Sequence, residues 1–170
     1  MRLKDKVAII TGGSRGIGFA TADAFLREGA KVAVAASSEK NAEAAVEKLK
    51  AIHPDAEVVG ISPNLGSFES VKEEFDKVEK QFGRIDILVN NAGVSESTPF
   101  TSYTEADFDR VIDLNVKGVF NATRAVVDGM IKNHSGVVLN TSSMVSISGQ
   151  PSGFEIGRAS CRERVFWVVG

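Results

Sequence analysis

Short β-branched segments alternate with longer segments of helical periodicity along most of this chain. The alternation predicts βαβ units, which wind a parallel sheet between two layers of helices. The predicted strands are residues 7–10, 31–35, 57–61, 85–90 and 136–141. The predicted helices are residues 17–28, 40–52, 68–82 and 105–133. Because the strands are short and mostly apolar, as in sheets covered on both faces, the sequence predicts one α/β domain with a Rossmann-type, doubly wound parallel sheet in three αβα layers.

The composition argues against several kinds of partner. With 170 residues, 43% of them hydrophobic, the chain can bury one core. A net charge of -2 without a basic block argues against nucleic acid or an anionic membrane as partner. The first apolar run, Val7 to Ile10, is too short for a signal peptide or a membrane-spanning helix. The single cysteine, Cys161, excludes an internal disulfide and a cysteine-based metal cluster. We therefore expect a cytoplasmic protein without a metal site.

A glycine-rich turn follows the first predicted strand and runs directly into a helix. Such a turn lets the backbone approach a pyrophosphate, whose charge is stabilised by the free N–H groups at the start of the helix. The spacing is G-x-x-x-G-x-G instead of the usual G-x-G-x-x-G, and no Lys-Ser or Lys-Thr pair of a phosphate loop follows. A plain βα turn is the alternative. The turn predicts a dinucleotide site formed by Thr11, Gly12, Ser14, Arg15, Gly16, Ile17 and Gly18.

The turn resembles the TGxxxGxG motif of the short-chain dehydrogenase/reductase family, and three more segments resemble motifs of that family in the same order. Asn90-Asn91-Ala92-Gly93 is similar to its NNAG motif. Leu114-Asn115-Val116 is similar to the segment with its structural and catalytic asparagine. Thr141-Ser142-Ser143 resembles the segment with its catalytic serine, and Ser143 aligns better than Ser142. The resemblance implies a nicotinamide-dependent oxidoreductase acting on a small carbonyl or alcohol substrate by hydride transfer.

In such an enzyme, Asn115 and Ser143 are catalytic, and Asn91, Ala92 and Gly93 line the cofactor cleft. Asn115 shares one face of the predicted helix 105–133 with Phe108, Val111, Ile112 and Val119. An unpaired buried amide costs about 1 to 3 kcal/mol, so Asn115 is expected either to bond backbone groups or to hold a water. A purely structural role is the alternative for Asn115, and bonding to local backbone is the alternative for Asn90 and Asn91.

The end of the second predicted strand bears on the choice of cofactor. An NAD enzyme presents an acidic residue to the ribose there, but this chain reads Ala35-Ala36-Ser37-Ser38. Arg15, Ser37 and Ser38 are suited to bind a 2′-phosphate, which favours NADP(H) over NAD(H); a simple surface role is the alternative for Arg15. Asn64 stands where the family usually has an aspartate that contacts adenine, and its amide can also form hydrogen bonds.

The resemblance ends abruptly. Counting from Ser143, the tyrosine and lysine of the family's Tyr-x-x-x-Lys pair would stand at positions occupied by Ile156 and Ser160. Tyr103, the only tyrosine, precedes the helix 105–133. We therefore expect residues 1–154 to form an incomplete NAD(P)-binding domain that lacks its last strands and helices, and the chain to be inactive.

Residues 155–170 resemble nothing in the family and have no helical or strand pattern. Part of this tail can be encoded by a reading frame of a common sequencing-library adapter, which predicts an assembly artefact; a divergent C-terminus is the alternative. Resequencing across the codon of Phe154 distinguishes the two. Without further strands, the segment 136–141 is expected to be an open sheet edge.

The implied activity leaves two classes of function open. The segment from Asn140 to Gly153 is most similar to the 3-oxoacyl-acyl-carrier-protein reductase branch, which predicts a carbonyl reductase. A non-catalytic nucleotide-binding module is the alternative, and a native Tyr-x-x-x-Lys beyond Phe154 would select the enzyme. Members of the family commonly pair through the helix corresponding to 105–133, so the resemblance implies a dimer or tetramer.

Overall fold

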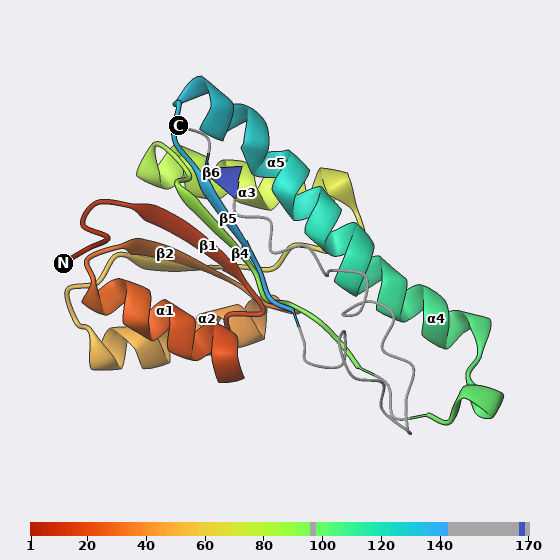
Figure 1. The fold of residues 1–170 in the computed structure, drawn as a ribbon. Helices are drawn as coiled ribbons and strands as arrows, with labels where there is room; N and C mark the ends of the chain where they lie inside the picture. The colour runs from red at the N-terminus through yellow and green to blue at the C-terminus, as the bar shows by residue number, and fades with distance from the viewer. Residues whose placement is uncertain (96–97, 143–166, 169–170) are drawn as a thin grey trace.

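The computed structural model describes residues 1–95, 98–142 and 167–168, and its centre is one twisted sheet. The strand order is β3-β2-β1-β4-β5-β6, and the first five strands in this order are parallel (Figure 1). The strands are β1 (Val7–Thr11), β2 (Lys31–Ala35), β3 (Val58–Ile61), β4 (Ile87–Asn90), β5 (Val137–Asn140) and β6 (Trp167–Val168). The chain winds outward from β1 in both directions, which confirms the predicted doubly wound sheet.

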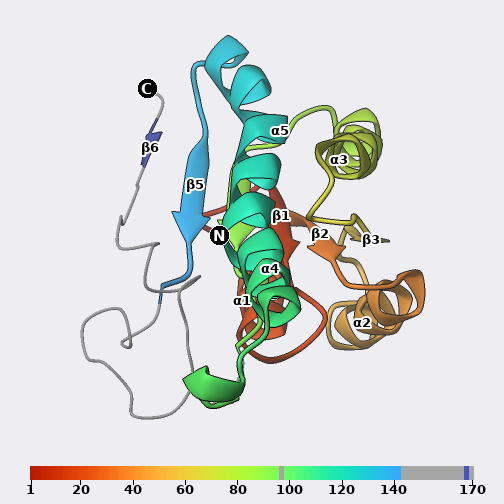
Figure 2. The same ribbon diagram turned by 90° about the vertical axis from the view of Figure 1, so that its right-hand side faces the viewer.

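Helices cover both faces of the sheet (Figure 2). α1 (Gly16–Arg27) and α2 (Glu39–Ile52) lie on one face, and α3 (Phe68–Phe82) and α5 (Gly118–Lys132) lie on the other. The two cores follow the alternation of side chains along β1: Val7 and Ile9 pack toward α3 and α5, whereas Ala8 and Ile10 pack toward α1 and α2. The predicted bounds of β1 to β5 and of α1 to α3 are within two residues of those observed.

The helix predicted at residues 105–133 is present, and it contains a π-helical turn. It is divided into α4 (Glu105–Ile112), a π-helical turn η2 (Asp113–Lys117) and α5, and it is preceded by a short 3-10 turn η1 (Phe100–Ser102). The predicted helix is therefore confirmed, but the sequence did not indicate the π-helical turn within it. The apolar periodicity concealed this turn, because Val111 before the turn and Ala122 after it are both buried. Turns of this kind occur frequently at functional sites.

The outer edge of β5 also differs from the prediction. Val137 and Val138 pair antiparallel with Val168 and Trp167 of β6. The expectations of a strand-free tail and of an open edge were therefore wrong at these positions. The unpaired N–H and C=O groups of an edge strand can pair with another extended segment. Here that segment is Trp167 and Val168, two residue types of high β propensity. The remainder of the tail lies outside the described residues.

None of the helices in the described part of the chain combines the length and apolarity needed to cross a membrane.

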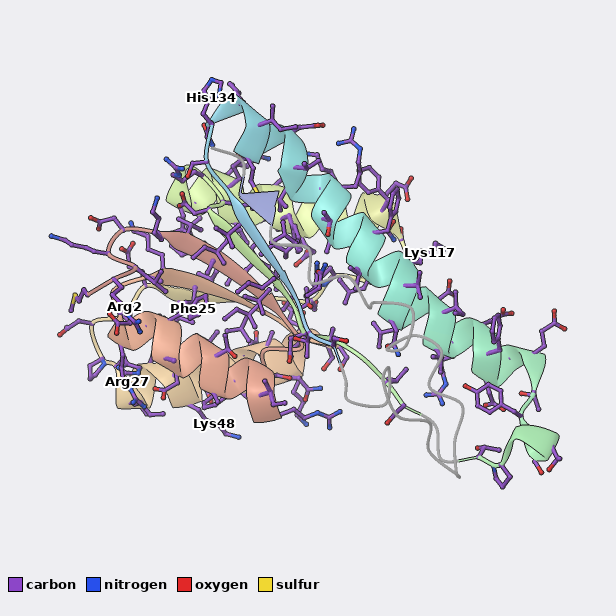
Figure 3. The ribbon with its side chains drawn as sticks, in the orientation of Figure 1. Arg2, Phe25, Arg27, Lys48, Lys117 and His134 are labelled. Atoms are coloured by element: carbon purple, nitrogen blue, oxygen red, sulfur yellow. The ribbon has the colours of Figure 1, made fainter. Side chains whose placement is uncertain are left out.

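A carboxylate joins α1 to the end of α2. Asp23 Oδ1 lies 2.6 Å from His53 Nε2, and Asp23 also pairs with Arg27, which lies on the outer surface of α1 (Figure 3). The hydrogen bond with His53 is the main cause that lowers the pKa of Asp23 below its ordinary value of 3.8; burial opposes this effect and the charge of Arg27 adds to it. The folded chain therefore favours the ionised form of Asp23.

This lowered pKa predicts a pH-dependent contribution to stability. The contribution is present above the unfolded-state pKa and is lost as the pH falls through the folded-state value. We expect Asp23→Asn to lower the free energy of unfolding at neutral pH, and the variant and wild type to converge at a pH well below 3.8. Urea unfolding over a pH series measures this. Asp128→Asn, on the exposed pair with Arg124, is the control and should change the free energy of unfolding by at most about 0.5 kcal/mol. A constant offset for Asp23→Asn at every pH would contradict the prediction.

Candidate functional site

A cleft of about 830 Å³ opens at the carboxyl end of the parallel strands. The predicted binding residues that line it are Gly12, Ser14, Arg15, Gly16, Ile17, Ser37, Asn64, Asn91, Ala92 and Gly93. Thr11, Gly18 and Ser38 are not among the lining residues. The cleft therefore brings together segments that follow β1, β2, β3 and β4, at the edge where open α/β sheets bind their ligands.

Thr11 is buried and links β1 to the segment after β4. Its Oγ1 accepts hydrogen bonds from the N–H groups of Asn91 and Ala92, both at 3.0 Å, and donates to the carbonyl of Val89. The Asn91 amide donates to the carbonyls of Thr11 (3.1 Å) and Gly12 (3.3 Å). Thr11 and Asn91 therefore hold the glycine-rich turn against the segment 91–93. The Asn91 amide thus bonds backbone, but the distant backbone of Thr11 and Gly12 and not the local backbone that the alternative named, and Asn91 also lines the cleft.

Two glycines of the turn are required by close approach. Gly12 has a φ of +65°, and a Cβ there would lie 2.9 Å from Ala92 Cα. A Cβ on Gly18 would lie 2.3 Å from the carbonyl oxygen of Gly12 and 2.6 Å from Asn91 Nδ2. Gly18 thus shapes the turn from the first helical residues of α1 without lining the cleft. The space kept free by these glycines is the kind of cradle into which a diphosphate fits.

The rim of the cleft is cationic and polar. Arg15, the exposed N-cap residue of α1, forms no ion pair with any residue that the structure describes. Lys48, on the outer side of the α1–α2 layer (Figure 3), is the other cation among the lining residues, and none of the described lining residues is Asp or Glu. The arrangement leaves positive charge available for an anionic ligand.

Ser37 and Ser38 lie at the start of α2 and differ in their surroundings. Ser38 is the N-cap residue, and its Oγ accepts a hydrogen bond from the N–H of Asn41. Ser37 lines the cleft and accepts a hydrogen bond from the Asn41 side chain. Asn41 and Lys48 were not predicted as site residues. A helical repeat of the lining residues Asn41, Ala44, Ala45 and Lys48 was the only sequence signal for this wall.

Asn115 lies on the turn η2 and is 5% exposed. Its Nδ2 donates to the carbonyl of Val94 at 2.8 Å, and its Oδ1 accepts from the N–H of Val94 at 2.9 Å. Of the two arrangements expected for this amide, the structure shows the one in which it bonds backbone groups. Because Val94 lines the cleft, Asn115 fixes the cleft wall that follows the NNAG segment.

Asn90 connects two strands and a helix. Its Nδ2 donates to Asn140 Oδ1 across the β4–β5 pair and to Thr123 Oγ1 of α5. These bonds give Asn90 a structural role, through distant side chains and not through the local backbone that the alternative named. Ser142 is exposed after β5, whereas Ser143, the predicted catalytic serine, lies outside the described residues.

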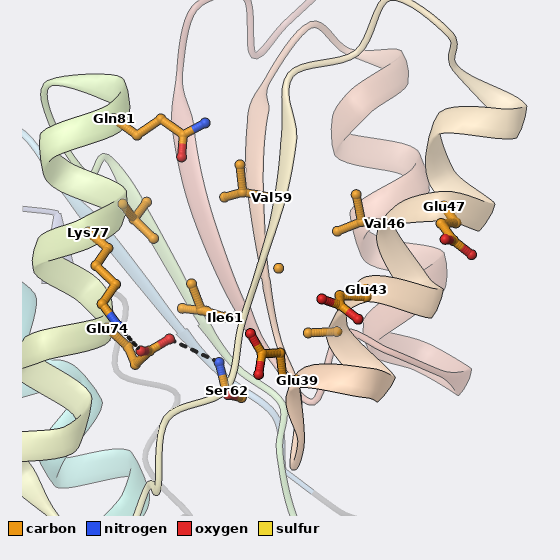
Figure 4. Close-up of a pocket in the computed structure, with 13 residues that line it drawn as sticks. Glu39, Glu43, Val46, Glu47, Val59, Ile61, Ser62, Glu74, Lys77 and Gln81 are labelled. Atoms are coloured by element: carbon orange, nitrogen blue, oxygen red, sulfur yellow. Dashed lines mark hydrogen bonds and ion pairs between the residues drawn. The ribbon is translucent and has the colours of Figure 1, made fainter.

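A second cleft, of about 860 Å³, lies over the outer edge of β3 between α2 and α3 (Figure 4). Its lining includes four carboxylates, Glu39, Glu43, Glu47 and Glu74, and one cation, Lys77. These carboxylates repel phosphate groups, so electrostatics favours the cleft at the glycine-rich turn as the nucleotide site. No group of three His, Cys, Asp or Glu side chains in the described part of the chain is arranged to hold a metal ion.

Comparison with known proteins identifies the class that this fold and cleft define. The sequence profile described as short chain dehydrogenase matches residues 6–155. The chain therefore belongs to the short-chain dehydrogenase/reductase family, whose members are oxidoreductases that bind NAD(P). The family match and the four motifs cover the same part of the chain.

Individual relatives show how the chain compares within this family. It is 48% identical over 153 residues to a 3alpha-hydroxysteroid dehydrogenase of Mediterraneibacter gnavus, covering 90% of this chain and 61% of the relative. It is 40% identical over 151 residues to the 3-oxoacyl-acyl-carrier-protein reductase FabG of Thermotoga maritima, covering 89% of this chain and 61% of the relative.

Two solved structures are also similar. The crystal structure of levodione reductase superposes with a TM-score of 0.85 at 36% identity, over 94% of this chain and 61% of that one. The structure of NAD+-bound xylitol dehydrogenase superposes with a TM-score of 0.88 at 31% identity, over 94% and 62%. The chain thus spans about three-fifths of the length of the relatives it matches.

Proposed function

We propose that residues 1–154 form the nucleotide-binding domain of an NADP(H)-dependent oxidoreductase that reduces a carbonyl or oxidises an alcohol. The observation that carries the proposal is the cleft, which gathers the glycine-rich turn, Ser37, Asn64 and the segment 91–93 around a cationic rim. The nicotinamide nucleotide supplies hydride transfer when bound. The chain itself supplies amides for the diphosphate from Gly12 to Gly18, and the positive end of α1 adds to their effect.

The NADP(H) preference rests on charge. Arg15 offers a guanidinium and Ser37 a hydroxyl at the rim, and none of the described lining residues is acidic. A carboxylate there would repel a 2′-phosphate and would instead bind the ribose hydroxyls of NAD(H). The similar xylitol dehydrogenase was solved with NAD+, so the family fold alone does not fix the choice. We infer the preference from the segment Ala35 to Ser38.

Arg15→Ala tests both the site and the preference. A hydrogen bond to a charged group contributes about 1.5 to 3 kcal/mol, so the Kd for NADP+ should rise by about 10- to 100-fold while that for NAD+ changes little. Isothermal titration of the 170-residue chain measures both. Arg124→Ala, which removes an exposed arginine of α5, is the control and should change neither. Equal losses for the two cofactors, or no uptake of NADP+ by the folded wild type, would refute the proposal.

For the chemistry, we propose Asn115 and Ser143 as the catalytic residues of the parent enzyme. Asn115 holds the backbone of Val94 at the cleft wall, and Ser143 would donate its hydroxyl to the substrate oxygen. Tyr103 is a poor substitute for the family's proton donor. Its hydroxyl bonds the carbonyl of Asp107, and burial, with the Asp107 charge, raises the pKa of Tyr103.

We therefore expect the 170-residue chain to bind the cofactor without turnover. The general acid of these enzymes needs a lowered pKa near neutral pH, and Ile156 and Ser160 stand at the positions of the Tyr-x-x-x-Lys pair. NADPH absorbance recorded with a panel of ketones and 3-oxoacyl thioesters measures this. Oxidation of NADPH above the rate without protein would contradict the expectation.

The substrate of the parent enzyme is proposed to be a small molecule with a ketone or secondary alcohol. Two relatives define the candidates: a 3-oxoacyl thioester, after the reductase FabG, and a hydroxysteroid, after the dehydrogenase that is 48% identical. A non-catalytic nucleotide-binding module is the second candidate function, favoured by Ile156 and Ser160 at the positions of the catalytic pair. A Tyr-x-x-x-Lys in the native sequence beyond Phe154 would decide for the enzyme.

We further propose that the parent enzyme is a homo-oligomer that associates through α4, η2 and α5. Large apolar side chains lie exposed along this segment, including Phe120, which is 65% exposed. The others are Phe108, Val116 and Ile131. Burial of such a row against a second copy would remove apolar surface from water.

A further inference from the structure

One buried amide outside the family motifs reaches the wall of the nucleotide cleft. Asn121 lies on α5, is 3% exposed, and is not among the residues that line the cleft. Its Nδ2 donates to the carbonyl of Leu65 at 2.8 Å. Leu65 and its neighbour Asn64 do line the cleft. The amide therefore connects α5 to the wall formed by the loop after β3.

The backbone of α5 approaches the same loop closely. Gly118 stands three residues before Asn121, on the neighbouring surface of the helix. A Cβ on Gly118 would lie 3.1 Å from Leu65 Cβ. Gly118 and Asn121 thus contact one residue of the loop, Leu65, by packing and by a hydrogen bond respectively.

The loop has hydrogen bonds of its own, but they are local. Asn64 Oδ1 accepts from the N–H of Gly66, and the N–H of Asn64 donates to Ser70 Oγ. The Ser67 side chain caps α3. These bonds set the internal shape of the loop. In the described part of the chain, the hydrogen bond from Asn121 is the one that sets the position of this loop relative to α5.

The same helical segment also holds the next wall of the cleft. Asn115 bonds the backbone of Val94 through both Nδ2 and Oδ1, and Val94 lines the cleft. The segment η2–α5 therefore braces two walls, one after β3 and one after β4. The glycine-rich turn between these walls is fixed to the wall after β4, by the hydrogen bonds between Thr11 and Asn91.

We propose that Asn121 is a positioning residue for the adenosine side of the nucleotide cleft. This inference rests on the proposed function, because it takes the loop of Asn64 and Leu65 as the wall that faces adenosine. Asn121 does not touch the nucleotide. Its hydrogen bond holds the carbonyl of Leu65 against α5. This bond thereby sets the distance between the loop wall and the glycine-rich turn.

The test uses an isosteric change in the 170-residue chain. Asn121→Asp replaces a donor by an acceptor that faces the carbonyl of Leu65, so the loop is pushed away from α5. The probe is 2′,5′-ADP, which carries the adenosine half of NADP+ alone. We expect its Kd to rise by about tenfold, a change of about 1.4 kcal/mol, in titrations well below the Tm of each protein.

A matched control separates positioning from general loosening of α5. Thr123→Val removes the acceptor that Thr123 Oγ1 offers to Asn90 on the same helix, away from the Leu65 loop. Its Tm should fall, but its Kd for 2′,5′-ADP should equal that of the wild type. If Asn121→Asp does not fold, Gly118→Ala, which pushes on Leu65 from the helix backbone, should give the same selective loss.

The outcomes are distinct. A tenfold loss for Asn121→Asp or Gly118→Ala with none for Thr123→Val supports the inference. Wild-type affinity in a folded Asn121→Asp, or equal losses in this variant and Thr123→Val, overturns it while the proposed function stands. Failure of the wild type to bind either 2′,5′-ADP or NADP+ overturns the proposed function and this inference with it.

Discussion

Gly18→Ala is expected to weaken the binding of NADP+ strongly. The added methyl would lie 2.3 Å from the Gly12 carbonyl oxygen and 2.6 Å from Asn91 Nδ2, distances that the turn can relieve only by moving. The displaced amides would lose hydrogen bonds to the diphosphate of about 1.5 to 3 kcal/mol each, so the Kd should rise by about 100-fold or more. Isothermal titration with NADP+, together with circular dichroism to confirm the fold, measures the effect.

Overpacking also destabilises the chain by about 1 to 3 kcal/mol, so a control of similar stability is needed. Gly83→Ala provides it. Gly83 ends α3 with a φ of +87° and has no atom within 4 Å of an added Cβ, so alanine there costs about 1 kcal/mol through backbone conformation alone. Gly83→Ala should keep the wild-type Kd. Equal affinity losses in the two variants would show that stability, and not the shape of the turn, governs binding.

The glycine-rich turn and the alternation of strands and helices along the chain were predictable because their signals are local. The residues from Thr11 to Gly18 favour a glycine-rich turn by themselves. The alternation of short apolar runs with helical segments predicts the three αβα layers. The capping pair of Thr104 and Asp107 fixes the start of α4 in the same way, with a reciprocal pair of hydrogen bonds. Information of this kind is contained within a few neighbouring residues.

The residues that were missed act across long stretches of chain. Asn121 bonds Leu65 over a separation of 56 residues, and nothing in the sequence around either one indicates the pairing. Lys48 reaches the cleft only because α2 packs beside the turn. The π-helical turn around Asn115 was hidden for a different reason, since an apolar pattern continues through it. Such features depend on tertiary contacts, which residue patterns do not encode.

Asp86→Ala is expected to lower the free energy of unfolding by about 3 kcal/mol, the lower end of the range for breaking a buried ion pair. Asp86 precedes β4 and is 3% exposed. Its Oδ1 lies 2.6 Å from Arg84 and 3.4 Å from Lys6, and its Oδ2 accepts a hydrogen bond from the N–H of Val7 at 3.0 Å. The carboxylate therefore ties the start of β1 to the start of β4.

The loss is large because the partners of Asp86 cannot all return to water. The Nε of Arg84 is buried and has no hydrogen-bond partner in the described part of the chain, and the N–H of Val7 is buried in the sheet. Removing the carboxylate leaves a cation without compensation and a donor unpaired, which costs more than the lost attraction itself. Because the Lys6 and Arg84 side chains are 45% and 39% exposed, water moderates the cost.

Urea unfolding of Asp86→Ala and of Asp128→Ala measures the difference. Asp128 pairs with Arg124 on the exposed side of α5, so its loss should cost at most about 0.5 kcal/mol. Asp86→Asn should fall between the two, because an amide oxygen still accepts from Val7 but no longer neutralises Arg84. A midpoint for Asp86→Ala equal to that of Asp128→Ala would mean that hydration of Arg84 and Lys6 replaces the pair. The start of the sheet would then be held by backbone pairing between β1 and β4 alone.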